Sequence, residues 1–252
     1  SAYFRALRVR LADVAERAWR SRYAGTLLYA QTAAPELGSN RRVQTADSKW
    51  VNAWSDPEGK NRGPFDAGVD LVGVRREDGT LDALLVNYGC HPVCFGPGNR
   101  AISGDYVSYL KDALEQHGDA RTVLFTVSGH ANIDPRKGVQ NDLEVVCRMG
   151  QGLAGIVRRA IPSLAPASGN GTAAAHEPWQ FNTTWKLEEY LTTSFVHAAS
   201  GAPVVTAVSA LAAGSLALLG LPGEVVNEYR AAFRKRSPFA QTFIVQLAGQ
   251  PG

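Results

Sequence analysis

The sequence predicts an α/β fold, in which mixed parallel and antiparallel β-sheets are flanked by helices. Three observations predict it. In several segments apolar residues recur every three to four positions, as they do on one face of a helix. Other apolar runs are short and end in turn residues, as strands do. Between two such runs, Asp78-Gly79 is a strong signal for an antiparallel hairpin.

The first half of the chain begins with an amphipathic pattern at 2–23, for which we predict a helix. A strand follows at 25–31. The stretch 32–65 is rich in Pro, Gly, Asn and Asp and has no sustained period, so we predict a long loop of the kind that often serves function. The runs on either side of Asp78-Gly79, at 69–75 and 81–88, are the predicted hairpin strands.

The second half repeats the alternation of helices and strands. We predict helices at 106–117, 143–160 and 225–236, and strands at 121–129 and 242–248. The apolar stretch 203–220 is rich in Ala, Ser, Thr and Gly, which favours two strands joined by a tight turn over a membrane-spanning helix. The stretch 163–180 is expected to be a loop or an insertion.

Composition narrows the function classes. The chain has 252 residues, a net charge of +3 and basic residues in short, scattered groups, so we expect no nucleic-acid partner. Three cysteines do not make a disulfide framework, although one bridge or three buried thiols both fit. No signal peptide is visible. We expect residues 1–252 to form a single domain that is incomplete at both ends.

Candidate chemistry lies in three polar loops, each of which follows an apolar strand: "GCHPV", "GHANIDP" and "LPGEV". They offer His91, then His130 and Asp134, then Glu224. Ligand sites in α/β folds gather beyond strand ends, and imidazole with carboxylate suits Zn²⁺. A histidine at a strand end is also a common structural residue, so the residues alone leave both readings open.

Six segments, in this order, resemble the catalytic domain of the neutral/alkaline, non-lysosomal ceramidases. They are "NRR" (40–42), "GPFDAGVDLVGV" (63–74), "VNYGCHPVCFG" (86–96), "ISGDYVSYL" (102–110), "FTVSGHANIDP" (125–135) and "LLGLPGEVVNEY" (218–229). The resemblance implies that the chain is part of a larger ceramidase-like catalytic domain. It also implies zinc-dependent hydrolysis of an amide bond, in N-acyl-sphingosine or a related lipid amide.

The resemblance also implies roles for individual residues. His91 and Glu224 match zinc ligands, and Arg41 matches an active-site arginine that would stabilise an oxyanion. A carboxylate near the start of a helix is a common alternative for Glu224. Cys90 and Cys94 would then be packing residues. The family's first zinc histidine and its zinc tyrosine have no match here, so we expect the fragment alone to be inactive.

One loop departs from the family. Asp134 stands where the family has a serine linked to amide attack, and Asn132 stands where it has an aspartate. Asp134 would be either a general base or a turn residue before a proline. Asn132 and His130 are candidate substrate-binding residues, and His130 is also a candidate extra ligand, proton shuttle or plain surface residue. Asp105 would orient His91 or cap the following helix.

The resemblance further implies peripheral contact with a membrane or micelle surface, and a secreted or periplasmic location. Two other functions remain: a non-catalytic binding protein that keeps the fold, and a hydrolase of a different amide or ester. An unrelated zinc peptidase or phosphoester hydrolase is weaker, because phosphoester chemistry usually recruits a second metal and more carboxylates than these loops supply.

Overall fold

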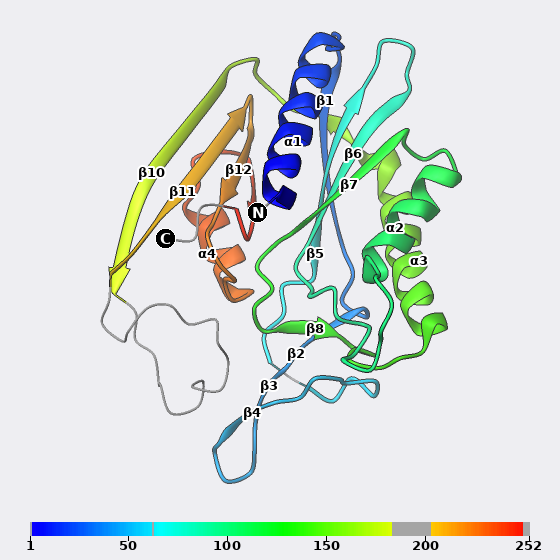
Figure 1. The fold of residues 1–252 in the computed structure, drawn as a ribbon, viewed down its shortest axis with the longest axis vertical. Coiled ribbons are helices and arrows are strands. Elements are labelled where there is room, and N and C mark those ends of the chain that lie inside the picture. Colours follow the sequence, from blue (N-terminus) through cyan, green and yellow to red (C-terminus); the bar gives the residue numbers. More distant parts are fainter. Residues whose placement is uncertain (1, 62, 183–202, 249–252) are drawn as a thin grey trace.

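The computed structural model describes residues 2–61, 63–182 and 203–248 (Figure 1). The helices are α1 (Ala2–Arg20), α2 (Asp105–Gln116), α3 (Leu143–Ala160) and α4 (Glu228–Arg236), with a 3₁₀ turn at Ile161–Ser163. The strands are β1 (Thr26–Ala33), β2 (Gly38–Asn40), β3 (Arg42–Gln44), β4 (Trp50–Asn52), β5 (Gly68–Arg75), β6 (Leu81–Tyr88), β7 (Thr122–Val127), β8 (Ile133–Pro135), β9 (Ala165–Pro166), β10 (Thr172–Asn182), β11 (Pro203–Ala213), β12 (Leu216–Gly220) and β13 (Gln241–Val245).

The larger sheet has five strands in the order β7-β6-β5-β1-β9. All neighbours in it are antiparallel except β6 and β7, which are parallel. The predicted hairpin is confirmed: β5 pairs with β6, and Gly79 takes the positive φ of 87° that the turn requires. The mixture of parallel and antiparallel neighbours confirms the predicted α/β class.

Helices α2 and α3 lie together on one face of this sheet (Figure 1). The predicted α3 bounds are confirmed, and Asp142 caps the helix by accepting a hydrogen bond from the Glu144 backbone N–H at 2.9 Å. Leu71 and Leu84 of the sheet and Leu110 and Leu153 of the helices belong to one buried apolar core. This core gives the edge of the sheet a rigid support.

The second sheet has four strands in the order β10-β11-β12-β13. The predicted tight turn within 203–220 is confirmed, because β11 and β12 pair antiparallel around Gly214, whose φ is 57°. Strands β12 and β13 are parallel. None of the described helices has both the length and the apolar character needed to cross a membrane.

Two loop predictions were wrong. The stretch 163–180 contains β9 and most of β10, and β10 pairs with β11 along eleven residues. Every residue of β10 is exposed, so this edge strand has no alternation of apolar and polar residues for a pattern to detect. The predicted loop at 32–65 contains the short strands β2, β3 and β4.

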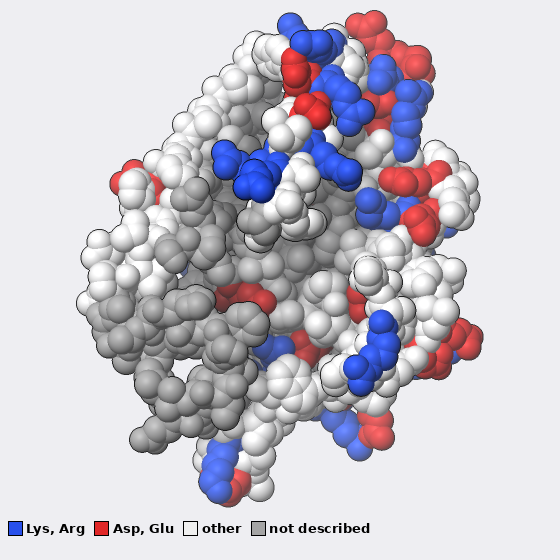
Figure 2. Space-filling view, in the orientation of Figure 1, with Lys and Arg blue, Asp and Glu red and all other residues white. Residues whose placement is uncertain are grey.

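Helix α1 forms as predicted, but none of its residues is buried. Basic side chains gather near the upper end of the molecule in Figure 2, in the region where Figure 1 places the arginine-rich helix α1. Arg20 of this helix pairs with Glu16 one turn earlier. The helix therefore contributes little to the core that supports the sheet.

The two sheets meet where β13 approaches β6 and β7. The Asn87 side chain of β6 donates a hydrogen bond to the Ile244 carbonyl of β13 at 2.8 Å. Just beyond β7 and β13, the Gln246 backbone N–H donates to the Val127 carbonyl at 3.0 Å. These contacts hold β13 and the residue after it against β6 and β7.

Candidate metal centre

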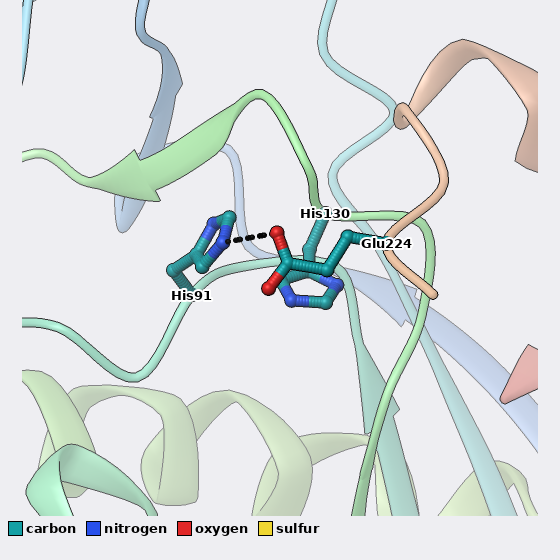
Figure 3. Close-up of side chains that lie close together, drawn as sticks. All are labelled: His91, His130 and Glu224. Atoms are coloured by element: carbon teal, nitrogen blue, oxygen red, sulfur yellow. Dashed lines mark hydrogen bonds and ion pairs between the residues drawn. The ribbon is translucent and has the colours of Figure 1, made fainter. Parts of the chain in front are cut away.

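Two histidines leave the larger sheet from equivalent positions. Tyr88 and Val127 are paired as the last residues of the parallel strands β6 and β7. His91 lies three residues beyond the first, and His130 lies three residues beyond the second. Neighbouring parallel strands end at the same edge of a sheet, so the two side chains are delivered side by side (Figure 3).

The third member of the group comes from the other sheet. Glu224 lies four residues beyond the end of β12 and points at the two imidazoles (Figure 3). One nitrogen or oxygen atom from each of His91, His130 and Glu224 lies within 4.8 Å of the other two. His91 Nε2 is 3.3 Å from Glu224 Oε2, and the imidazole centroids are 4.2 Å apart. We refer to these three residues as the His-His-Glu cluster.

Backbone carbonyls set the tautomer of both imidazoles. His91 Nδ1 is 2.9 Å from the Ile133 carbonyl oxygen, and His130 Nδ1 is 3.0 Å from the Ser128 carbonyl oxygen. A carbonyl only accepts hydrogen bonds, so each Nδ1 carries the hydrogen. In the neutral rings this leaves the Nε2 lone pairs for a ligand. Such a contact to the second nitrogen is typical of histidines that bind metals.

The charge states of the cluster follow from burial and mutual contact. Burial alone would lower the pKa of His91, but its hydrogen bond with Glu224 contributes to a net raised pKa. The same hydrogen bond lowers the pKa of Glu224. Burial, followed by the nearby charge of His91, lowers the pKa of His130. At neutral pH, Glu224 is therefore an anion and His130 is neutral, which are the forms that bind a cation.

The donor set fits a zinc ion. Two ligand atoms about 2.1 Å from zinc at a tetrahedral angle lie roughly 3.4 Å apart, close to the 3.3 Å between His91 Nε2 and Glu224 Oε2. Two histidines and a glutamate are a known catalytic zinc set. The histidines are buried, whereas the Glu224 side chain is 45% exposed. The cluster therefore faces solvent on one side, where catalytic zinc keeps its open position.

Asp134 and Arg41 lie beside the cluster. Asp134 Oδ1 is 3.2 Å from Arg41 Nη1 and 3.3 Å from His91 Nδ1. The Arg41 guanidinium lies over the Trp54 ring, 4.7 Å from its centroid. Asp134 is fully buried, and its other oxygen, Oδ2, has no hydrogen-bond partner. Burial raises the pKa of Asp134, against the opposing charges of Arg41 and His91.

The turn alternative for Asp134 was wrong, because this residue lies in strand β8 and pairs with Ser39 of β2. The surface alternative for His130 was also wrong, since only 2% of this residue is exposed. Asn132 is buried: its Oδ1 accepts from the Asn227 backbone N–H at 2.9 Å, and its Nδ2 donates to Glu228 at 2.9 Å. A role for Asn132 in substrate binding stays a prediction.

Asp105 serves the loop that carries His91 and makes no described contact with the imidazole. Its carboxylate accepts hydrogen bonds from the backbone N–H groups of Cys94 and Phe95, at 3.1 and 2.9 Å. It also accepts from Tyr106 N–H, at the start of α2. Cys90 is a free, buried thiol, as is Cys94, which supports their interpretation as packing residues.

The sequence held a signal for His130 as a partner of His91. The segments Tyr88-Gly-Cys-His and Val127-Ser-Gly-His place a histidine at the same distance from the end of each strand. The signal becomes specific only if the two strands are known to be parallel neighbours. The hairpin signal in the sequence predicts only an antiparallel pair, so it does not show that β6 and β7 are parallel neighbours.

Solved structures of ceramidases share this fold. The neutral ceramidase from Pseudomonas aeruginosa matches 92% of this chain with a TM-score of 0.71 and 15% identity. A ceramidase complexed with C2 also matches 92%, with a TM-score of 0.70 and 12% identity. The chain spans about half the length of these proteins, 46% and 48% respectively. No family model and no curated protein matches the sequence.

Proposed function

We propose that this chain carries the metal centre of a zinc-dependent hydrolase of amide bonds, ceramidase-like in fold and chemistry. The observation that carries the proposal is the convergence of His91, His130 and Glu224 at one edge of the larger sheet, where each Nδ1 contacts a backbone carbonyl and His91 Nε2 faces Glu224. The fold shared with neutral ceramidases supports the choice of reaction. The resemblance supplied only two zinc ligands in this chain, and His130 is the proposed third.

When bound, zinc supplies a Lewis acid that polarises a carbonyl and lowers the pKa of water. The protein residues would do the rest. Arg41 is held in place by Asp134 and by the Trp54 ring, and it would neutralise the negative charge that develops on the carbonyl oxygen. Asp134 would accept the proton of the attacking water. Its unpartnered Oδ2 and raised pKa support that role.

The proposed substrate is a lipid amide, N-acyl-sphingosine or a relative, presented at a micelle or membrane surface. An exposed aromatic side chain near the cluster supports such contact, because Trp54 is 49% exposed and stacks on Arg41. Trp50, on the β3–β4 hairpin, is 69% exposed. A secreted or periplasmic location is part of the same proposal.

Metal analysis tests the three-ligand centre. We expect about one zinc per chain after loading and dialysis, and loss of the metal in His91→Ala, His130→Ala and Glu224→Gln. His117→Ala is the matched control, because His117 is exposed and pairs with Asp119 at the end of α2. Zinc retained by His130→Ala would reject the third ligand, and no zinc in the unmodified chain would reject the metal centre.

Hydrolysis of a short-chain N-acyl-sphingosine in detergent micelles tests the reaction. This chain spans about half the length of the ceramidases and is expected to be inactive alone, so the test uses the complete gene product. Loaded with zinc, it should release the fatty acid, and Asp134→Asn should slow this by roughly 10²-fold or more if it acts as the base. A zinc-loaded complete protein that hydrolyses neither this amide nor related amides and esters would instead favour a binding protein that keeps the fold.

A further inference from the structure

We infer that Asn227 is the positioning residue that sets the distance between His130 and Glu224. This inference rests on the proposed metal centre and concerns how the two loops are held rather than which atoms bind. Asn227 lies three residues after Glu224 and is completely buried. Nothing in the motif resemblance drew attention to it.

Asn227 occupies the N-cap position of α4 but does not cap it. Asparagine is favoured at such positions because its side-chain oxygen accepts a hydrogen bond from the first turn of the helix. Here the side chain makes no capping hydrogen bond. Its side-chain amide makes hydrogen bonds to other segments of the chain instead. These hydrogen bonds, and not helix capping, explain why an asparagine stands at this position.

The amide joins three segments. Asn227 Nδ2 donates to the Gly129 carbonyl at 2.8 Å, and Gly129 directly precedes His130. Asn227 Oδ1 accepts from the Asp66 backbone N–H at 2.6 Å, and Nδ2 also approaches the Asp66 carbonyl at 3.3 Å. The side chain therefore fixes the segment that follows Glu224 against the His130 loop and against the entry to β5.

Backbone contacts continue the link on both sides. The Asn227 backbone N–H donates to Asn132 Oδ1 at 2.9 Å, and the Asn132 carbonyl accepts from the Arg41 backbone N–H at 2.8 Å. The Val225 carbonyl, next to Glu224, accepts from the His130 backbone N–H at 3.0 Å. The loops that carry His130, Glu224 and Arg41 are thus connected through Asn227 and its immediate neighbours.

Two glycines make room for this arrangement. A Cβ on Gly89 would lie 2.4 Å from the Gly129 carbonyl oxygen and 2.9 Å from Asn227 Nδ2. A Cβ on Gly129 would lie 3.2 Å from the Asn227 Cα. Gly89 precedes His91 by two residues, so the backbone of both histidine loops passes close to Asn227. The spacing of the cluster is therefore built around this one side chain.

The chain contains a matched control. Asn87 is also a buried asparagine, 1% exposed, and its Nδ2 donates to Thr126 Oγ1 at 3.0 Å and to the Ile244 carbonyl at 2.8 Å. It joins β6 to β7 and β13 and has no described hydrogen bond to the loops of the cluster. Asn87→Ala therefore removes a comparable buried amide without removing the link between His130 and Glu224.

In the first measurement, the full chain is titrated with Co²⁺ and with Zn²⁺ to obtain its affinity for each metal. Urea unfolding is measured on the same samples. We expect Asn227→Ala and Asn227→Asp to weaken binding by roughly 10- to 100-fold, as loss of a ligand-orienting contact does. Asn87→Ala should change the affinity by less than about 3-fold even where it lowers stability equally. Equal losses of metal affinity in the Asn227 variants and in Asn87→Ala would overturn the inference.

The second measurement needs no metal. In the metal-free protein, the His91 and His130 rings are close enough for a nuclear Overhauser contact between their ring protons. Asn227 holds the His130 loop through the Gly129 carbonyl, so loss of its side chain should let His130 move and weaken this contact, which should persist in Asn87→Ala. An unchanged contact in both the Asn227 variants and Asn87→Ala would show that Asn227 does not position His130 and would overturn the inference. Asn132→Ala, which removes the partner of the Asn227 backbone N–H, replaces them if neither Asn227 variant folds. A chain that binds no metal but loses this contact would reject the proposed function and keep the positioning role.

Discussion

Two groups of charged and titratable side chains connect the segment after β12 to the larger sheet, and they are built on opposite plans. In the first, Arg230 of α4 lies between Asp66 and Asp70, and Arg230 and Asp70 are almost completely buried. In the second, the His-His-Glu cluster brings together two imidazole lone pairs and a carboxylate. The first group pairs opposite charges, whereas the second gathers electron-pair donors around a point that holds no cation of the protein.

The difference separates structure from function. A buried arginine that is paired with carboxylates has its charge compensated within the protein, and removing one partner leaves an uncompensated buried charge. In the cluster, His91 and Glu224 stabilise each other's charged forms, and a metal ion would have to replace the His91 proton. The Arg230 group holds its cation within the protein, whereas the cluster is proposed to bind one from solution. Three predictions test this contrast.

Removing Arg230 should have the largest effect on stability. Arg230→Met leaves the buried Asp70 carboxylate without its closest cation, whose Nη2 lies 2.6 Å from Asp70 Oδ2. Breaking one side of a buried pair lowers the free energy of unfolding by about 3–5 kcal/mol. Urea unfolding at pH 7 measures this. Arg234→Met is the control, because Arg234 is 25% exposed and lies 3.5 Å from Asp70; a loss as large as that of Arg230→Met would contradict the role of burial.

Zinc should have the next largest effect, and only through the cluster. At 100 times its dissociation constant, a ligand that binds only the folded state raises the free energy of unfolding by about 2.7 kcal/mol. We expect this gain in the unmodified chain and its reversal by a chelator. Glu224→Gln should unfold at nearly the same urea concentration with and without zinc. The same gain in that variant would place the metal elsewhere.

The sequence predicted what local patterns encode. The hairpin at Asp78-Gly79, the helix α3 and the tight turn at Gly214 follow from turn residues and periodicity that lie within a few positions of one another. Strand β10 was missed because an exposed edge strand buries neither face, and Pro178 within it argues against a strand. Its pairing with β11 is a tertiary contact that no local pattern records.

The site shows the same limit. His91 and Glu224 were proposed as ligands from the polar loops after strands and from the motif resemblance, and the structure places them 3.3 Å apart. His130 was left among several roles because its distance from His91 depends on β6 and β7 being parallel neighbours. Asn227 was missed altogether, since its value lies in joining Gly129 to Asp66 across long stretches of sequence. Sequence patterns point to candidate metal ligands more readily than to the residues that hold those ligands at the right distance.

Substitution in a group of charges nearer the surface should have the smallest effect on the free energy of unfolding. This group separates the contribution of burial from the contribution of charge pairing. Asp82 on β6 pairs with Arg76, at 2.8 Å from Nε, and accepts from the Tyr23 hydroxyl. Arg121 lies 3.5 Å from the same carboxylate and is 61% exposed. The group resembles that of Arg230 in composition but lies nearer the surface, because the Asp82 side chain is 15% exposed and that of Arg76 is 32% exposed. Pairs near the surface contribute about 0.2–1 kcal/mol.

Asp82→Asn should therefore lower the free energy of unfolding by at most about 1 kcal/mol at pH 7. The hydrogen bond from Arg76, then that from Tyr23, lowers the pKa of Asp82 in the folded state, so its stabilisation is present above the unfolded pKa of about 3.9. It is lost as the pH falls from there through the folded pKa, and the variant and the unmodified chain should converge in acid. Glu77→Gln is the control, because it removes an exposed charge from the turn between β5 and β6. A loss at pH 7 as large as that of Arg230→Met would mean that pairing alone, without burial, stabilises this fold.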